Sequence, residues 1–223
     1  MMFINLDPDT SAPAVHLRNV FDPEGLKNMI KEITKQAPAE KGTHAEGDGI
    51  DSVDAKRKST VRWFMDLNFE QHLRTAVDLA NFNAGWRYDI VKSEMLQFTE
   101  YSPGGHYSWH TDGAGCHHSA RLWQMSDKPQ NLRETKDVQL LGTVRKISVS
   151  VILNDDYEGG ELEFLEIDHN GELRVTKITP EIGSAIIFPS YINHRVTPVT
   201  KGTRYSVVAW YGGPPFKLSL IHI

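Results

Sequence analysis

Helical patterns in the first part of the chain and a series of short apolar runs in the second part predict an α+β protein that is mainly β. In such a protein, N-terminal helices support a β-sandwich or jelly roll. The 223 residues have an ordinary globular composition, with 39% hydrophobic and 24% charged residues. We therefore expect one domain over residues 1–223, with a helical part over about 1–86, a jelly-roll core over about 87–213 and a short C-terminal tail.

The first predicted helix begins at Asp22-Pro23, because Asp is a favoured N-cap residue and Pro is favoured at the first helical position. The apolar residues that follow recur on one helical face: Leu26, Met29, Ile30 and Ile33. The dipeptide Ala37-Pro38 ends this helix. A second helix carries Phe69, Leu73, Ala76, Val77 and Ala80 and ends near Asn83-Ala84-Gly85. Between the two helices, the polar and glycine-rich residues 40–58 predict a loop.

From residue 88 onward the pattern becomes typical of strands. Residues 88–101 alternate between apolar and polar side chains. Further short strands, separated by glycine-containing turns, are predicted at 147–153, 162–167, 174–178, 185–188 and 205–211. Residues 113–143 are polar, irregular and longer than an ordinary connection, so they predict a lid or binding loop.

Charge and cysteine content narrow the class of protein. A formal net charge of -5 gives no electrostatic reason to expect a nucleic acid or a membrane as partner. The single cysteine, Cys116, permits no intrachain disulfide and no zinc–sulfur site. The N-terminal residues lack the basic start and apolar run of a signal peptide, and no stretch approaches the ~20 apolar residues of a membrane span. We therefore expect a cytoplasmic location, while the sequence leaves the oligomeric state open.

Two residues, His110 and Asp112, form the first candidate for a metal site. On a strand end, residues i and i+2 point to the same side, so both side chains can reach one ion. A pair of this kind also arises by chance, and His44-Ala45-Glu46 is a second one, which we interpret as solvated surface within the loop at 40–58.

Three further features distinguish the first pair. His194 follows an apolar strand and so lies near the rim of a sheet. Arg204, ten residues later, begins an otherwise apolar strand, and an arginine that enters a sandwich interior needs an anionic partner. An aromatic, glycine-rich stretch at 101–109 precedes the pair.

Two histidines and one carboxylate are the ligand set of non-haem iron(II) oxygenases. Three protein ligands leave coordination positions for a bidentate 2-oxo acid and for dioxygen. The distal carboxylate of 2-oxoglutarate then needs a planar, permanently charged partner, which an arginine such as Arg204 supplies. The sequence therefore predicts an iron(II) centre with a neighbouring dicarboxylate site.

With these residues in place, the chain resembles the prolyl 4-hydroxylase-like branch of the 2-oxoglutarate/iron(II) oxygenases. The segments that carry the resemblance are 57–63, 95–101, 110–112, 147–164, 188–189, His194 and 201–211. The resemblance implies a double-stranded β-helix core with iron at one mouth. It implies that iron is bound by His110, Asp112 and His194, that Arg204 pairs with the side-chain carboxylate of 2-oxoglutarate, and that Tyr101 hydrogen-bonds the same co-substrate.

The resemblance also implies roles for two further aromatic residues and a serine. Tyr107 and Trp210 fall where family members line the co-substrate and substrate pocket, although ordinary core packing explains both equally well. Some relatives carry a hydroxyl where this chain has Val208, and Ser206, on the same strand face as Arg204, is the candidate substitute.

The implied reaction converts 2-oxoglutarate and dioxygen to succinate and carbon dioxide while an unactivated C–H bond is hydroxylated, with ascorbate as a candidate reductant. The namesake reaction of the family favours a prolyl residue of a peptide or protein. Lysyl residues, free amino acids and other small molecules are the alternatives, and segment 113–143 is where the chain departs most from smaller relatives.

Three other functions compete with this one. A halogenase needs a vacant coordination position where Asp112 stands. A cupin-like isomerase or a sugar-binding jelly roll has no need of an inward arginine ten residues after the last histidine. A metal-dependent hydrolase could use zinc with two histidines and an aspartate, but it also needs a base that the sequence does not identify.

Overall fold

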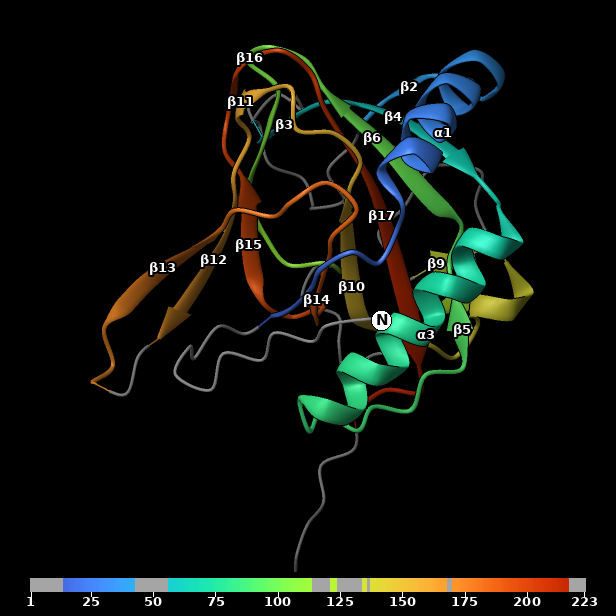
Figure 1. Cartoon of the computed structure of the whole chain (residues 1–223). Coiled ribbons are helices and arrows are strands. Elements are labelled where there is room, and N and C mark those ends of the chain that lie inside the picture. Colours follow the sequence, from blue (N-terminus) through green and yellow to red (C-terminus); the bar gives the residue numbers. More distant parts are fainter. Residues whose placement is uncertain are drawn as a thin grey trace, which may run out of the picture.

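Two β-sheets face each other in the computed structural model, which describes residues 14–42, 56–113, 121–123, 134–135, 137–167 and 170–216 (Figure 1). The larger, eight-stranded sheet has the order β1-β14-β10-β17-β6-β4-β2, with β5 paired to β17. Its strands are β1 Val15–Leu17, β14 Ala185–Pro189, β10 Val144–Ile152, β17 Arg204–Gly213, β6 Leu96–Tyr101, β4 Thr60–Phe64, β2 Glu40–Lys41 and β5 Lys92–Ser93.

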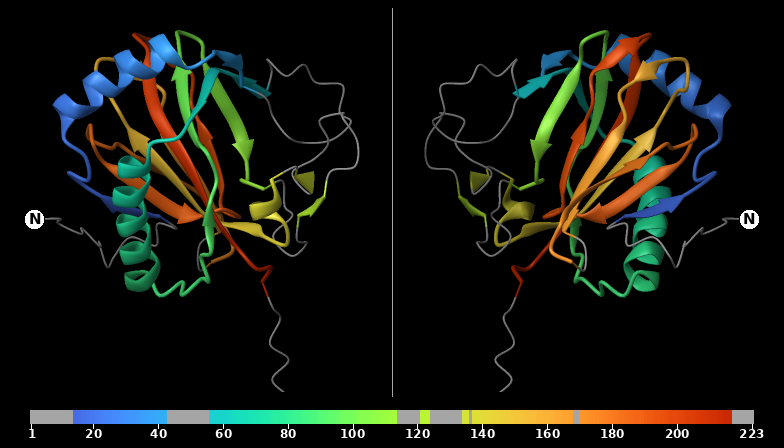
Figure 2. Two further views of the ribbon diagram at one scale, coloured as in Figure 1. Left: turned by 90° about the vertical axis from the view of Figure 1, so that its right-hand side faces the viewer. Right: turned by 90° about the vertical axis from the view of Figure 1, so that its left-hand side faces the viewer.

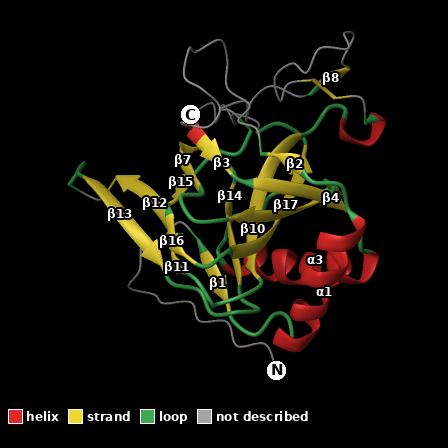
Figure 3. Ribbon diagram, turned by 90° about the horizontal axis from the view of Figure 1, so that it is seen from above, coloured by secondary structure: helices red, strands yellow, loops and turns green. Residues whose placement is uncertain are grey.

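The smaller, five-stranded sheet has the order β13-β12-β15-β7-β3. Its strands are β13 Leu173–Ile178, β12 Leu162–Ile167, β15 Asn193–Val196, β7 His106–His110 and β3 Arg57–Lys58. Two further pairs are β11 Glu158–Gly159 with β16 Val199–Lys201, and β8 Leu122–Trp123 with β9 Glu134–Thr135. Seen from above, the β12–β13 pair lies on the opposite side of the molecule from the helices (Figure 3).

Both predicted helices are confirmed, and their ends have the expected causes. Helix α1, Pro23–Gln36, is capped by the Asp22 carboxylate, which accepts a hydrogen bond of 2.9 Å from the Gly25 N–H. Helix α3, Leu67–Asn83, is capped in the same way by Asp66, which accepts from the Phe69 N–H at 3.0 Å. In the part of the chain that the structure describes, no helix is long and apolar enough to cross a membrane.

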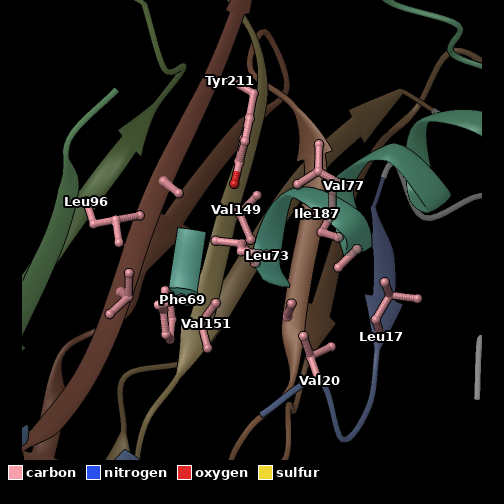
Figure 4. Packing of buried hydrophobic residues seen from close by; sticks show 14 of the residues in the cluster. Leu17, Val20, Phe69, Leu73, Val77, Leu96, Val149, Val151, Ile187 and Tyr211 are labelled. Carbon is pink, nitrogen blue, oxygen red and sulfur yellow. The ribbon is translucent and has the colours of Figure 1, made fainter. Parts of the chain in front are cut away.

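Helices α1 and α3 cover one face of the large sheet (Figure 2). Because successive strand residues alternate between faces, Val149 and Val151 of β10 point toward the helices and pack against residues such as Leu73 (Figure 4). All three side chains are fully buried. Burial of one such side chain contributes roughly 1.5–3 kcal/mol, so this layer is the main hydrophobic core.

The opposite face of the large sheet looks toward the small sheet and is unusually polar. Residues of the other strand parity lie here, and those that are polar and buried include Gln97, Thr99, Ser148, Ser150, Arg204 and Ser206. A second, smaller apolar cluster shares the space between the sheets and contains Tyr101, Ile152, Leu162, Phe164, Ile186, Phe188, Val196 and Val199. The space between the sheets is therefore lined by polar side chains from the large sheet and by the apolar side chains of the second cluster.

The strands predicted in the second half are confirmed within a few residues, but the prediction of a mainly helical first half is wrong for four short strands. β1, β2, β3 and β4 all come from residues 15–64. The loop predicted over 40–58 is wrong at both ends, because β2 pairs with β4 and β3 pairs with β7; residues 43–55 lie outside the described residues. Such short strands are specified by the edge that they pair with rather than by their own pattern.

The base of the predicted lid is well defined. The Arg121 N–H donates to the Thr143 carbonyl at 3.0 Å, and the Gly142 N–H donates to the Arg121 carbonyl at 3.1 Å. Between these ends lie β8, β9 and a short 3-10 helix, Val138–Leu140. Much of the lid prediction falls on 114–120, 124–133 and 136, which are outside the described residues.

Candidate metal centre

Strand pairing brings the three predicted metal ligands together. β7 and β15 are neighbours in the small sheet, and their register places His110 directly opposite His194. Asp112 follows β7, and its N–H donates to the Ser190 carbonyl at 2.9 Å, which holds the residue over the same spot. One oxygen of Asp112 lies 3.6 Å from Nε2 of His110 and the other lies 3.7 Å from Nε2 of His194. All three ligand atoms fall within 4.8 Å of one another, close enough to bind one ion.

Backbone carbonyls fix the orientation of both imidazoles. Nδ1 of His110 lies 2.8 Å from the Ser108 carbonyl, and Nδ1 of His194 lies 2.9 Å from the Ile192 carbonyl. A carbonyl oxygen can only accept a hydrogen bond, so each Nδ1 carries the proton and donates it. Each Nε2 then presents its lone pair toward Asp112, which is the tautomer that a metal ion requires.

Burial and charge hold two of these groups in their metal-binding forms. Burial, followed by the neighbouring His194, lowers the pKa of His110 to about 3, so this imidazole is neutral at physiological pH. Burial alone would raise the pKa of Asp112, but His194, His110, Arg145 and a hydrogen bond from Ser148 together lower it. The carboxylate is therefore ionised, and two nitrogens with one oxygen form a donor set that suits iron(II).

Arg204 lines the same cavity and has no carboxylate partner among the residues that the structure describes. Only 1% of the residue is exposed, its Nη1 donates to Ser206 Oγ at 2.9 Å, and its Nε is buried with no partner. No salt bridge to Arg204 occurs within the described ranges. A buried cation without an anion is costly. The surroundings of Arg204 are therefore suited to the carboxylate of a bound ligand.

The remaining predicted residues line this cavity as well. Tyr101 is the strand partner of Arg204, and its ring centroid lies 5.6 Å from the guanidinium carbon. Tyr107 stacks on the His110 ring at 3.5 Å between centroids. Trp210 projects from the far end of β17, and its indole N–H is buried with no hydrogen-bond partner. Ser206 touches Arg204 directly, so its hydroxyl helps to hold the guanidinium.

The family model of the 2OG-Fe(II) oxygenase superfamily matches residues 96–212, which contain all three ligands and Arg204. The chain belongs to this superfamily. The resemblance inferred from the sequence is therefore confirmed.

Curated relatives of this chain are named PKHD-type hydroxylases. The protein from Alteromonas mediterranea is 32% identical over 113 residues, which cover 51% of this chain and 41% of the relative. A protein from Pseudomonas putida is 25% identical over 205 residues, covering 88% of this chain and 76% of the relative. The alignment thus spans less than half the length of the first of these proteins.

Similar solved structures establish the fold of this chain. The viral collagen prolyl hydroxylase of Paramecium Bursaria Chlorella virus-1 superposes with a TM-score of 0.59 at 18% identity, covering 91% of this chain and 97% of the other. A prolyl hydroxylase from Trichoplax adhaerens, in complex with a peptide of hypoxia inducible factor, gives a TM-score of 0.63 at 18% identity, covering 90% of this chain and 84% of the other. The predicted double-stranded β-helix core with supporting helices is confirmed.

Several residues that line this cavity were not predicted as site residues, above all Arg57, Arg145, Gln97 and Trp63. Arg57 donates from Nη2 to Gln97 Oε1 at 2.8 Å, and its guanidinium lies 4.6 Å from the Tyr107 ring centroid. Arg145 pairs with Glu94 and stacks on Trp210. Arg145 adjoins an apolar strand just as Arg204 does, and this sequence pattern could have identified Arg145 as a pocket residue. Arg57 and Gln97 show no such pattern, since only the tertiary pairing of their strands turns them toward the cavity.

Proposed function

We propose that this chain is a 2-oxoglutarate- and iron(II)-dependent dioxygenase that hydroxylates an unactivated C–H bond, with a prolyl residue of a peptide or protein as its substrate. One observation carries the proposal: a two-histidine, one-carboxylate trio and a buried arginine without a carboxylate partner share one cavity. Membership of the superfamily supports the same conclusion.

In this proposal, His110, Asp112 and His194 hold iron(II), and the Nδ1–H bonds to the Ser108 and Ile192 carbonyls keep both imidazoles in position. Bound iron supplies the activation of dioxygen that makes attack on a C–H bond feasible. No described side chain then needs to act as a general base for the C–H step. The protein orients the reactants and excludes water from them.

Arg204 has the chemistry to bind the distal carboxylate of 2-oxoglutarate through charge-assisted hydrogen bonds. Ser206 holds the guanidinium from the same strand, and Tyr101 offers a hydroxyl from the neighbouring strand. The walls between Arg204 and the ligand trio include Leu162, Phe188 and Val196, whose apolar side chains exclude water. Succinate and carbon dioxide are the co-products, and ascorbate is the reductant to include in assays.

A prolyl substrate is supported by the relatives. The curated matches are named PKHD-type hydroxylases, and two of the solved structures are named prolyl hydroxylases, one of them with a bound peptide. Inside the cavity, the ring centroids of Trp63 and Trp210 lie 6.1 Å apart with the ring planes tilted by 39°, and the two indoles offer an apolar surface on which a prolyl ring can pack. A lysyl residue, a free amino acid or another small molecule is the alternative substrate.

Succinate formation tests the proposal. Purified protein is incubated with iron(II), 2-oxoglutarate and ascorbate, with and without panels of prolyl peptides, lysyl peptides and free amino acids. We expect iron-dependent succinate that increases with a prolyl peptide, together with a mass increase of one oxygen atom in that peptide. His194→Ala should abolish both. Succinate formation that persists at full rate in this variant would overturn the ligand assignment, and stimulation by lysyl peptides alone would overturn the substrate.

A further inference from the structure

Glu94 is a buried carboxylate that the proposed iron and 2-oxoglutarate sites do not use. It lies between β5 and β6, its N–H donates to the Trp210 carbonyl at 2.9 Å, and its side chain is 11% exposed. Two arginines share it. Arg145 donates from Nε to Oε1 at 2.8 Å and from Nη2 to Oε2 at 2.7 Å, and Arg121 donates from Nη2 to Oε1 at 2.6 Å. One carboxylate thus fixes two buried guanidinium groups.

A β-bulge turns Arg145 toward the pocket. In β10, Ile147, Val149 and Val151 face the helices, and an undisturbed strand would place Arg145 on that same face. The register with β17 shifts between Arg145 and Ile147, so that Arg145 pairs with Gly212 and projects into the chamber between the sheets. Bulges next to active sites commonly re-aim a side chain in this way. Here the guanidinium carbon comes to lie 3.9 Å from the Trp210 ring centroid.

Arg121 belongs to the same cluster. Its backbone N–H and carbonyl pair with Thr143 and Gly142, which directly precede β10. Its Nη1 is buried and has no hydrogen-bond partner. Its link to Glu94 therefore joins the residues before β10 to the pocket wall that Arg145 and Trp210 form.

We propose that Glu94 is a positioning residue for the prime substrate: by clamping Arg145 against Trp210 and anchoring Arg121, it sets the substrate side of the pocket. This inference rests on the proposed function and deepens it. Arg204 and Trp210 lie six residues apart on β17, which is ~20 Å along a strand. A five-carbon diacid that is bound at Arg204 and reaches the ligand trio leaves the Trp210 end for the prime substrate.

The charge of the cluster also selects among substrate classes. Two guanidinium groups share one carboxylate, so the cluster carries an excess positive charge beside the pocket. A lysyl ammonium would be repelled here, and like charges in a buried setting interact strongly. An uncharged prolyl ring can pack on the indole, and its carbonyl can accept from Arg145. The clamp therefore favours a peptidyl proline over a lysyl residue.

Glu94→Gln tests the clamp, with Glu163→Gln as the matched control, because Glu163 accepts from Arg195 at 2.7 Å outside the pocket lining. For a prolyl peptide that the wild-type protein hydroxylates, we expect the KM to rise at least tenfold in Glu94→Gln. The Kd of 2-oxoglutarate for the manganese(II)-loaded protein should stay within twofold of the wild-type value. Glu163→Gln should change neither quantity. An unchanged KM, or equal losses of peptide and 2-oxoglutarate affinity, would overturn the proposal.

Arg121→Gln provides a second variant in case Glu94→Gln does not fold, because it leaves the Arg145–Glu94 pair intact. In this variant, amide hydrogen exchange of the metal-free protein should quicken at position 121 and at Gly142, while β10 stays protected. Unchanged exchange at both amides overturns the anchoring role of Glu94. If the wild-type protein hydroxylates no prolyl peptide of the panel, the proposed prolyl substrate is wrong. The exchange measurement still decides whether Glu94 anchors Arg121.

Discussion

Buried arginines of this protein differ in what neutralises their charge, and that difference distinguishes Arg204 from Arg62 and Arg145. Arg62 pairs with Glu100 at 3.1 Å, and Arg145 makes a two-point pair with Glu94. Arg204 has one serine hydroxyl as its hydrogen-bond partner and no carboxylate within the described parts of the chain. Since a buried charge needs an anion, we propose that the carboxylate of a bound ligand supplies it at Arg204.

Replacement of Arg204 by Met should therefore affect the free and the liganded protein in opposite directions. Without ligand, loss of an unpaired buried charge should raise the free energy of unfolding by roughly 1–3 kcal/mol. The stabilisation that 2-oxoglutarate confers on the wild-type protein should disappear. Arg62→Met is the control and should lower stability, because it leaves Glu100 without its partner. Urea unfolding with and without 2-oxoglutarate measures both effects, and a destabilised ligand-free Arg204→Met would contradict the assignment.

Glu94 gives a pH dependence with a defined sign. Burial would raise its pKa, but the charges and hydrogen bonds of Arg145 and Arg121 outweigh burial and lower it. A carboxyl group whose pKa is lowered by folding stabilises the protein at pH values above its pKa in the unfolded chain, which is ~4.3. That contribution is lost as the pH falls through the pKa in the folded protein. At neutral pH, Glu94→Gln should lower the free energy of unfolding by about 3–5 kcal/mol. The difference in free energy of unfolding between this variant and the wild type should shrink below pH ~4. A pH-independent difference in urea unfolding would contradict this account.

Among the elements, the glycine turn before β12 holds Arg204 in place. Gly160 adopts a φ of +64°, and a Cβ built on it would lie 2.9 Å from Cδ of Arg204 and 2.9 Å from Cγ2 of Val199. The side chain of Arg204 can therefore cross the sheet interior only because this position has no Cβ. The turn between β12 and β13 contains Gly171, whose φ is +82°, with no atom within 4 Å of the corresponding Cβ position.

These two glycines allow a matched test. Gly160→Ala and Gly171→Ala both place an L side chain in the left-handed region, at a cost of roughly 1 kcal/mol. Only Gly160→Ala adds a collision with Arg204, so it should also weaken 2-oxoglutarate binding several-fold and leave manganese(II) binding unchanged. Isothermal titration of both variants measures this. Equal 2-oxoglutarate affinities of the two variants would show that Arg204 can shift away from the added methyl group without loss of binding.

At the scale of the whole molecule, the two faces of the large sheet have separate tasks. The helix-covered face holds the main core, whereas the other face carries the chamber with the ligand trio. Phe164 and Phe188 belong to the second cluster, and the Phe188 ring centroid lies 4.7 Å from that of His194. Stability and metal binding should therefore respond to different core positions.

Leu73→Ala and Phe188→Leu test this division. Leu73 is fully buried on α3, so its truncation should lower the free energy of unfolding by about 2–5 kcal/mol while the Kd of manganese(II) stays unchanged in the folded protein. Phe188→Leu should lower stability less, because volume changes little, but it should weaken metal binding, since the His194 ring loses its edge-on neighbour. Weaker metal binding in Leu73→Ala would show that the two faces are not independent.

The sequence by itself determined the helices, the long strands and the residues of the candidate iron centre. Capping residues, periodic apolar positions and the His110–Asp112 spacing are local features, and local physics decides them. Strands β1 to β4, the inward turn of Arg57 and Gln97, and the bulge that aims Arg145 became visible only in the tertiary structure. The reason is that a two-residue strand, a bulge or a shared carboxylate depends on a partner far away in the chain, as Glu94 depends on Arg145. The periodicity of a segment does not specify which strand edge or which charged side chain will lie next to it in the fold.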